Sequence, residues 1–374
     1  MGTAAFDAQH MTRALALAAR GQGLVEPNPM VGCVIARGEQ VIAEGWHGRF
    51  GGPHAEIEAL RMAGQRAAGA TLYVTLEPCC HFGKTPPCTR AVLAAGIRRA
   101  VMAQLDPFPQ VQGSGAAELR EAGVTVEIGL LESEARRLGA PYLKLVATGR
   151  PWIIAKWAMT LDGRIATRTG SSQWISGVAA RAAVHQLRGR VDALLVGRGT
   201  AAADDPLLTA RPPGPRTATR IVVDSQGGLS LDSRLVHTAR EAPVLVAVGP
   251  TASAERRQAF RAAGCEVWVG PAAERSERLG QLLDELGSRR LTNVLVEGGG
   301  QLLGSLFDLG ALDEVHAFIA PKLVGGAQAP GPLAGRGVAQ MLEAVRLEPP
   351  VVEMLEGDLY LRARVQREAD GAQA

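Results

Sequence analysis

The residues best suited to chemistry in this sequence are one histidine and two cysteines, His54, Cys79 and Cys88. An imidazole and two thiolates are favourable zinc ligands, and three protein ligands leave a fourth coordination position open for water. An open position favours catalysis, because zinc lowers the pKa of a coordinated water to roughly 7. Proton transfer would then need a carboxylate that is not a ligand. Glu56, two residues after His54, is the candidate.

A closed structural zinc site is the main alternative. Cys80 and His81 follow Cys79 directly, and either could supply a fourth ligand. A closed site would give no reason for Glu56, although a glutamate in a first helical turn can simply complement the helix dipole. The odd total of five cysteines does not suit a disulfide framework.

The segments that carry these residues predict alternating strands and helices. Residues 30–37 and 40–47 have the pattern of two strands joined by a turn, and residues 54–64 predict a helix. Residues 70–78 predict a strand that ends directly before Cys79. A helix that begins at such a loop would favour a thiolate. This alternation predicts an α/β layer with helices on both faces of the sheet.

A second domain is predicted after a break in this pattern. The periodicity stops at residues 147–152, where a Gly-Arg-Pro turn precedes a new apolar strand. We therefore expect two domains, residues 1–148 and 149–374. Apolar strand-like segments and amphipathic helices alternate again in the second half, which predicts a second α/β domain.

Composition and charge narrow the class of protein. The length of 374 residues favours two or three domains, and 47% hydrophobic residues can supply more than one core. Lys+Arg 40 against Asp+Glu 37 gives a net charge of +3, with the charges dispersed, so nucleic acid is a disfavoured partner. We find no apolar run of membrane length and no signal-peptide pattern in residues 1–20. We therefore expect a cytoplasmic protein.

The metal-binding pattern resembles a known enzyme family. His-x-Glu followed by Pro-Cys and a second cysteine is the signature of zinc deaminases of nucleobases. Here eight residues, CHFGKTPP, separate the two thiols. The stretch PCCHFGKTPPC after TLE resembles the deaminase of bacterial riboflavin biosynthesis. NPMVGCVI, GWHGRFGGPHAEIEAL and DPFPQVQGSG are similar to segments of the same family, in the same order.

This resemblance implies a cytidine-deaminase-like, three-layer α/β/α fold for the first domain. It implies zinc ligation by His54, Cys79 and Cys88, with Glu56 as the acid and base. It also implies contacts to pyrimidine, ribose or phosphate at Asn28, His47, His81 and Lys84.

Two positions depart from the family pattern. Cys80 stands where serine is usual, and Phe108 stands where asparagine is frequent. Phe108 would remove a polar group from the pocket rim, so we expect it to alter binding rather than chemistry.

The second half resembles the reductase that is fused to this deaminase in bifunctional enzymes, a domain similar in fold to dihydrofolate reductase. The motifs are KWAMTLDGRIAT, SSQWIS, HQLRGRVDALLVGRGTAAADDPLLTAR, RIVVDS and VLVEGGGQLLGSLF. The resemblance implies NADPH as cofactor. The implied substrate contacts are Ser172, Arg188, Leu208, Arg211 and Glu297. The implied cofactor contacts are Ala158, Trp174, Thr200, Asp204, Ser225, Gly299 and Gly300.

The residues themselves give a weaker indication of the same chemistry. VLVEGGG predicts a strand, a glycine turn and a helix, whose first amides could approach a phosphate closely. It lacks the G-x-G-x-x-G pattern, and a glycine turn alone is common. The guanidinium groups of Arg188 and Arg211 suit a phosphate monoester.

The resemblance covers roughly residues 7–365 and implies a bifunctional enzyme of the riboflavin pathway. The first implied step is hydrolytic deamination of 2,5-diamino-6-(5-phosphoribosylamino)pyrimidin-4(3H)-one. The second is NADPH-dependent reduction of the ribosyl side chain, which gives 5-amino-6-(5-phosphoribitylamino)uracil. We expect zinc and NADPH as cofactors, a small-molecule substrate, no nucleic-acid or membrane partner, and a homodimer or homotetramer. We also hypothesise that each domain grips the same 5′-phosphate.

Two other functions fit parts of the sequence. The second domain could have lost reductase chemistry and serve as an oligomerisation or regulatory scaffold, which NADPH binding would test. The chain could instead be a zinc-stabilised binding protein, in which Glu56→Ala would change nothing measurable.

Overall fold

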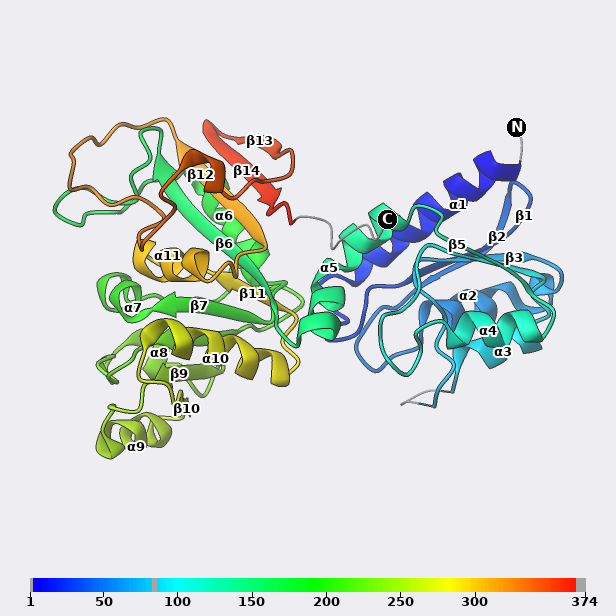
Figure 1. Ribbon diagram of the computed structural model, residues 1–374, viewed down its shortest axis with the longest axis horizontal. Coiled ribbons are helices and arrows are strands. Elements are labelled where there is room, and N and C mark those ends of the chain that lie inside the picture. The colour runs from blue at the N-terminus through cyan, green and yellow to red at the C-terminus, as the bar shows by residue number, and fades with distance from the viewer. Residues whose placement is uncertain (1–2, 83–85, 368–374) are drawn as a thin grey trace. The chain divides into compact units, whose positions relative to one another are not determined.

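The computed structural model describes residues 3–82 and 86–367. It forms two compact units, Met1–Gly149 and Arg150–Ala374, whose limit lies one residue beyond the division expected from the sequence (Figure 1). Among the described residues, no helix has both the length and the apolar character that crossing a membrane requires.

The first unit contains a five-stranded sheet in the order β2-β1-β3-β4-β5. β1 pairs antiparallel with both β2 and β3, whereas β3, β4 and β5 run parallel. The strands are β1 (Gly32–Arg37), β2 (Gln40–Trp46), β3 (Thr71–Val74), β4 (Arg99–Met102) and β5 (Thr125–Ile128).

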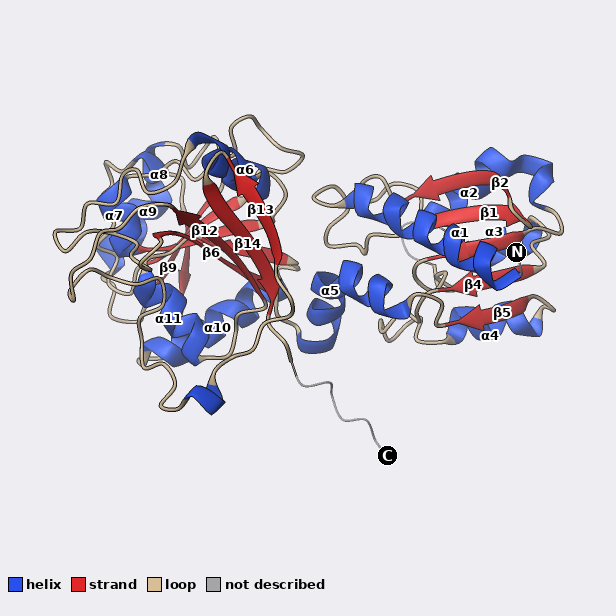
Figure 2. Ribbon diagram, turned by 90° about the horizontal axis from the view of Figure 1, so that it is seen from above, coloured by secondary structure: helices blue, strands red, loops and turns tan. Residues whose placement is uncertain are grey.

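Helices cover both faces of this sheet, so the unit has the predicted three layers (Figure 2). Residues of α1 and α5 share one apolar core with the sheet, and residues of α2, α3 and α4 share the other. The helices are α1 (Thr3–Ala18), α2 (Ala55–Ala63), α3 (Cys88–Ala94), α4 (Ser114–Glu121) and α5 (Glu132–Thr148), with 3-10 turns at Ala19–Gly21 and Gly64–Ala67.

Two glycines let the helices approach the sheet closely. A Cβ at Gly32 in β1 would lie 2.0 Å from the Ala14 carbonyl oxygen of α1. A Cβ at Gly45 in β2 would lie 2.3 Å from the Ala55 carbonyl oxygen, at the start of α2. Only glycine permits such contacts, so these residues fix where α1 and the first turn of α2 lie.

The second unit contains a nine-stranded sheet in the order β10-β9-β8-β7-β11-β6-β12-β14-β13. The strands from β10 to β12 in this order are parallel, and β12, β14 and β13 form an antiparallel edge. The strands are β6 (Trp152–Thr160), β7 (Ala193–Gly197), β8 (Thr219–Val223), β9 (Val244–Val248), β10 (Glu266–Val269), β11 (Asn293–Val296), β12 (Glu314–Ala320), β13 (Val351–Leu355) and β14 (Asp358–Arg364).

Two apolar cores lie on opposite faces of this sheet. α10 and α11 contribute to one core, and α7, α8 and α9 contribute to the other. α6 packs on Phe318 and Tyr360 at the antiparallel edge. The helices are α6 (Val178–Arg188), α7 (Arg198–Asp204), α8 (Arg234–His237), α9 (Ala254–Ala262), α10 (Arg275–Ser288) and α11 (Gly300–Asp308), with a 3-10 turn at Met341–Glu343.

Candidate functional site

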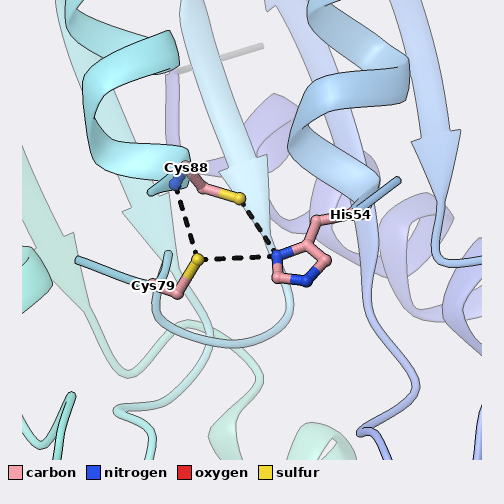
Figure 3. A group of neighbouring side chains, drawn as sticks. All are labelled: His54, Cys79 and Cys88. Carbon is pink, nitrogen blue, oxygen red and sulfur yellow. Dashed lines mark hydrogen bonds between the residues drawn. The ribbon is translucent and has the colours of Figure 1, made fainter. Parts of the chain in front are cut away.

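The three candidate metal ligands come from two helix starts and one loop (Figure 3). His54 is the residue before α2, Cys88 is the first residue of α3, and Cys79 lies in the loop after β3. One ligand atom from each residue lies within 4.8 Å of the others. The structure thus brings together three residues that are far apart in the sequence.

Their spacing fits a tetrahedral zinc ion. The His54 Nδ1 atom lies 3.2 Å from the Cys88 Sγ and 3.5 Å from the Cys79 Sγ. Usual zinc–nitrogen and zinc–sulfur bond lengths place two such ligand atoms about 3.6 Å apart in a tetrahedron. The donor set of one nitrogen and two sulfurs is also one that zinc favours.

The residues of the cluster favour the thiolate form of Cys79. Hydrogen bonds from the Cys88 thiol and from His54 lower the pKa of Cys79 to about 4. The backbone N–H of Cys88 also donates to the Cys79 Sγ at 3.4 Å. The hydrogen bond that the Cys88 thiol donates to Cys79, together with burial, raises the pKa of Cys88 instead. Since a bound dication favours the deprotonated form of its thiol ligands, zinc would release the proton of Cys88.

Glu56 lies beside this cluster and is 3% exposed. Burial raises its pKa above the ordinary 4.5, and the nearby His54 opposes that rise. A carboxyl group whose pKa is closer to neutral pH is a more effective proton carrier. Glu56 therefore has the position and the environment expected of an acid and base next to a metal.

Glu77 fixes the loop that carries Cys79. Its buried carboxylate accepts hydrogen bonds from the backbone N–H groups of Asp106, Gly113 and Ala116, at 3.2, 2.9 and 2.9 Å. These bonds tie the loop after β3 to the loop before α4 and to the first turn of α4. Our sequence reasoning missed this role, although a lone glutamate at the end of an apolar strand was a signal.

Asn28 and His47 form a hydrogen-bonded pair next to the metal cluster. The His47 Nδ1 atom lies 2.9 Å from the Pro53 carbonyl oxygen, so this nitrogen carries the proton. The His47 Nε2 atom, 3.2 Å from Asn28 Nδ2, then accepts from the amide. The His47 and His54 rings meet edge to face at 5.5 Å. Asn28 thus turns its amide NH₂ towards His47.

The other predicted substrate contacts of this unit are His81 and Lys84. His81 is half-buried, and its ring lies 6.0 Å from that of Phe108. Its Nδ1 atom is buried and has no hydrogen-bond partner among the residues that the structure describes. Lys84 lies outside the described residues. Among the residues described, the metal group includes neither Cys80 nor His81, and the Cys80 thiol donates to the Gln110 carbonyl oxygen at 3.7 Å. This geometry argues against a closed structural site.

The second unit contains a cavity of about 810 Å³ at the carboxyl ends of β6, β7, β8 and β11. Ligands of parallel α/β sheets bind at this edge. The predicted contacts that line it are Ala158, Ser172, Arg188, Thr200, Asp204, Leu208, Ser225, Glu297, Gly299 and Gly300.

A buried charge cluster occupies one side of this cavity. Arg188 donates two hydrogen bonds to the Glu297 carboxylate, at 2.6 and 2.9 Å, and the Lys156 Nζ lies 3.5 Å from the same carboxylate. These two cations lower the pKa of Glu297 to about 2, although burial opposes the shift. Lys156 was missed from the sequence. A single lysine inside the apolar strand 152–160 was the available signal.

Two predicted contacts do not line the cavity. Arg211 is exposed, and its backbone N–H donates to the His185 Nδ1 at 3.3 Å. Trp174 is 64% exposed, and the Arg181 guanidinium lies 4.6 Å from the centre of its ring. Both residues therefore remain predicted contacts that lie outside the lining of the cavity.

The glycine turn after β11 has two structural requirements. The Gly299 N–H donates to the Thr200 hydroxyl at 3.0 Å, which ties the turn to α7. A Cβ at Gly300 would lie 2.7 Å from the Gly331 carbonyl oxygen, and a Cβ at Gly304 would lie 1.7 Å from that of Ala334. Close packing of the chain around residues 331–334 therefore demands glycine at both positions.

Comparison with known proteins gives the class of each unit. The family described as "Cytidine and deoxycytidylate deaminase zinc-binding region" matches residues 4–104, and "RibD C-terminal domain" matches residues 151–360. A riboflavin biosynthesis protein RibD from Actinobacillus pleuropneumoniae is 42% identical over 355 residues, which are 95% of this chain and 94% of that protein.

Solved structures agree over the whole chain. Acinetobacter baumannii RibD is 35% identical with a TM-score of 0.86, covering 97% of this chain and 100% of that one. A Thermotoga maritima protein is 33% identical with a TM-score of 0.83, covering 98% and 100%. Its title describes a diaminohydroxyphosphoribosylaminopyrimidine deaminase/5-amino-6-(5-phosphoribosylamino)uracil reductase.

Fold, site and matches together define a zinc-binding deaminase unit joined to a reductase unit in one chain. The predicted fold class is confirmed. The chain belongs to the RibD family, the bifunctional deaminase–reductases of riboflavin biosynthesis.

Proposed function

We propose that this enzyme deaminates 2,5-diamino-6-(5-phosphoribosylamino)pyrimidin-4(3H)-one and then reduces the ribosyl side chain with NADPH. The observation that carries the proposal is the His54–Cys79–Cys88 cluster with Glu56 buried beside it. His54, Cys79 and Cys88 hold zinc in this proposal. When bound there, zinc activates a water molecule for attack on the amino-bearing ring carbon.

Glu56 carries the protons of the first step. It takes a proton from the attacking water, passes one to the ring nitrogen and then one to the departing ammonia. Its burial keeps this exchange away from solvent. Asn28, His47, His81 and Lys84 bind the pyrimidine, ribose or phosphate, and Asn28 is oriented by its hydrogen bond to His47.

The cavity of the second unit is the proposed reductase site. The cofactor contacts are Ala158, Trp174, Thr200, Asp204, Ser225, Gly299 and Gly300, and the substrate contacts are Ser172, Arg188, Leu208, Arg211 and Glu297. The hydride chemistry belongs to the nicotinamide, so these residues orient cofactor and sugar. A volume of about 810 Å³ at the strand ends supports this assignment.

In this unit, the binding site for the substrate's 5′-phosphate has to be compatible with the ion pair between Arg188 and Glu297. Because the Arg188 guanidinium already donates two hydrogen bonds to Glu297, a phosphate would share Arg188 with Glu297 or bind to Arg211. Arg211 would have to turn towards the cavity to contribute.

We further propose a homodimer or homotetramer that acts in the cytoplasm. Apolar side chains are exposed on the edge strand β13 and before it, with Val352 51%, Met354 65% and Leu342 91% exposed. Such a surface is typical of an interface between protein chains. The five free cysteines suit a reducing compartment.

Mass spectrometry of the product formed from the diaminopyrimidine phosphate tests the two reactions together. In isotopically labelled water with deuterated NADPH, we expect one labelled oxygen in place of an amine and one deuterium on the side chain. Oxygen uptake without deuterium would favour a deaminase whose second unit is a scaffold. No uptake of either label would favour a zinc-stabilised binding protein.

A further inference from the structure

The loop between β4 and α4 contacts the chain around the metal ligand Cys79 at two points. The Asp106 backbone N–H donates to the carboxylate of Glu77, two residues before Cys79, at 3.2 Å. The thiol of Cys80, the residue after Cys79, donates to the Gln110 carbonyl oxygen at 3.7 Å. Both ends of this part of the loop are therefore tied to the segment that carries the metal ligand.

Phe108 lies in the middle of this part of the loop, residues 106–110, beside His81. The centres of the two rings are 6.0 Å apart and the rings are tilted by 43°, a separation within the usual range for aromatic pairs. The Phe108 carbonyl oxygen accepts from the backbone N–H groups of Val111 and Gln112, at 2.8 and 3.1 Å. Phe108 therefore limits the positions that the His81 ring can occupy.

The Asp106 carboxylate holds the backbone of Phe108. Asp106 is 7% exposed, and its Oδ1 atom accepts from the Phe108 N–H at 2.9 Å and from the Tyr142 hydroxyl at 2.9 Å. Burial raises the pKa of Asp106, and these two hydrogen bonds oppose that rise. The carboxylate that fixes the backbone of Phe108 is thus itself stabilised by Tyr142.

Tyr142 reaches this loop from α5. It is 9% exposed, and its hydroxyl is directed at Asp106. Gly139 of the same helix lies against Gln104, whose Nε2 atom would be 3.7 Å from a Cβ at that glycine. α5 therefore packs against the loop and supplies a hydroxyl to its buried carboxylate. Because a buried charge is costly without donors, phenylalanine at position 142 would weaken the hold of Asp106 on the loop.

We propose that Tyr142 is a positioning residue for the deamination reaction. Through Asp106, it holds Phe108 beside His81. The proposal rests on the proposed function, in which His81 binds the substrate of the first unit. Without the Tyr142 hydroxyl, residues 106–110 move more freely and His81 loses the neighbour that limits its position. The metal ligands and the acid and base belong to other segments, so substrate binding weakens while the chemical step keeps its rate.

Tyr142→Phe tests the proposal, with Tyr73→Phe as the matched control. Tyr73 of β3 is also buried, and its hydroxyl donates to the carboxylate of Asp7 in α1 at 2.6 Å. Each substitution removes one hydroxyl from a buried tyrosine–aspartate pair of the first unit. Both should therefore lower Tm by a similar amount, about 2–4 °C.

The kinetics of ammonia release by the zinc-loaded full chain, without NADPH, separate the two variants. Tyr142→Phe should raise the KM for the diaminopyrimidine phosphate about fivefold, as the loss of one hydrogen bond predicts, and should leave kcat within about twofold and the zinc content unchanged. Tyr73→Phe should change KM by less than about twofold, because its hydroxyl serves the packing of α1 instead.

Two further measurements follow the connection from Tyr142 to Phe108. Hydrogen–deuterium exchange of peptides that cover residues 104–113 should become faster in Tyr142→Phe and stay unchanged in Tyr73→Phe, because exchange reports local opening of the loop. In a Phe108→Ala background, Tyr142→Phe should raise KM by less than about twofold, because two residues that act through one contact are not additive.

The outcomes separate the proposal from the function on which it rests. Equal KM values for the two tyrosine variants, or a rise in KM that persists undiminished in the Phe108→Ala background, would overturn the role of Tyr142. Unchanged exchange of residues 104–113 in Tyr142→Phe would overturn it as well. If the wild-type enzyme released no ammonia, the proposed deamination would be refuted, and the exchange measurement would still decide whether Tyr142 holds the loop.

Discussion

Replacing Glu297 by glutamine should destabilise the second unit strongly. The substitution leaves Arg188 and Lys156, whose side chains are 14% and 16% exposed, without the carboxylate that compensates them. These cations shift the pKa of Glu297 from 4.5 to about 2. One pKa unit corresponds to about 1.4 kcal/mol, so the charged carboxylate contributes about 3 kcal/mol to folding at pH 7. Removing one partner of a buried ion pair typically lowers the free energy of unfolding by a similar amount, about 3–5 kcal/mol.

The pH dependence of this loss has a definite sign. A folded-state pKa below the unfolded value gives stability that is complete above pH 4.5 and disappears as the pH falls through about 2. The difference between wild type and Glu297→Gln should therefore shrink from about 3 kcal/mol at pH 7 to about 1.5 kcal/mol at pH 3.

Urea unfolding followed by tryptophan fluorescence measures this difference, since four of the five tryptophans belong to the second unit. Glu353→Gln is the matched control, because its ion pair with Arg362 is at 3.4 Å and nearly half exposed on both sides. That control should cost less than about 1 kcal/mol. A loss below about 1 kcal/mol for Glu297→Gln at pH 7, or an equal loss at pH 3, would refute this electrostatic reasoning.

Four other substitutions test the remaining assignments. Glu56→Gln should keep the zinc content but lower the deamination rate at least about a hundredfold, whereas Cys88→Ala should lose both zinc and deamination. Measuring the zinc content and the deamination rate of each variant distinguishes the two roles. Unchanged deamination in Glu56→Gln would contradict the role of Glu56. Gly214→Ala should raise the substrate KM more than it lowers kcat, because its Cβ would lie 2.4 Å from the Cα of Gly189, the residue after the proposed substrate contact Arg188. Unchanged kinetics would show that the chain at residues 189 and 214 absorbs the clash. Val352→Lys should shift the mass in light scattering towards the monomer without lowering Tm, and an unchanged mass would exclude β13 from the interface.

Much of the fold could be predicted because the buried parallel strands appear as short apolar runs between helices. The helix Glu132–Thr148 was missed, since Pro141 lies inside it and interrupts the usual helical signal. The hairpin formed by β13 and β14 was also missed. Val351–Leu355 is mostly exposed, so its apolar residues lack the alternation of a half-buried strand.

The residue types of the metal cluster made it easier to predict from the sequence than the charged residues of the cavity. Histidine and cysteine are rare, and their combination with a nearby glutamate restricts the chemistry even before their positions are known. Arginine and lysine are common surface residues, so Lys156 gains meaning only when the sheet order places its strand beside β11 and Glu297 at the cavity. The same ambiguity applies to Arg211, a predicted substrate contact that does not line the cavity.

The glycine turn shows how one motif can have two causes that the sequence cannot separate. We interpreted VLVEGGG as a turn that lets backbone amides approach a phosphate. Gly300 and Gly304 have to be glycine because the chain at 331–334 packs against them, whether or not a ligand binds. A Cβ at Gly299 would meet only the Thr200 hydroxyl oxygen, at 3.4 Å, which is an ordinary contact. The packing thus sets no requirement for glycine at position 299, so within this motif only Gly299 is left whose glycine a bound phosphate could explain.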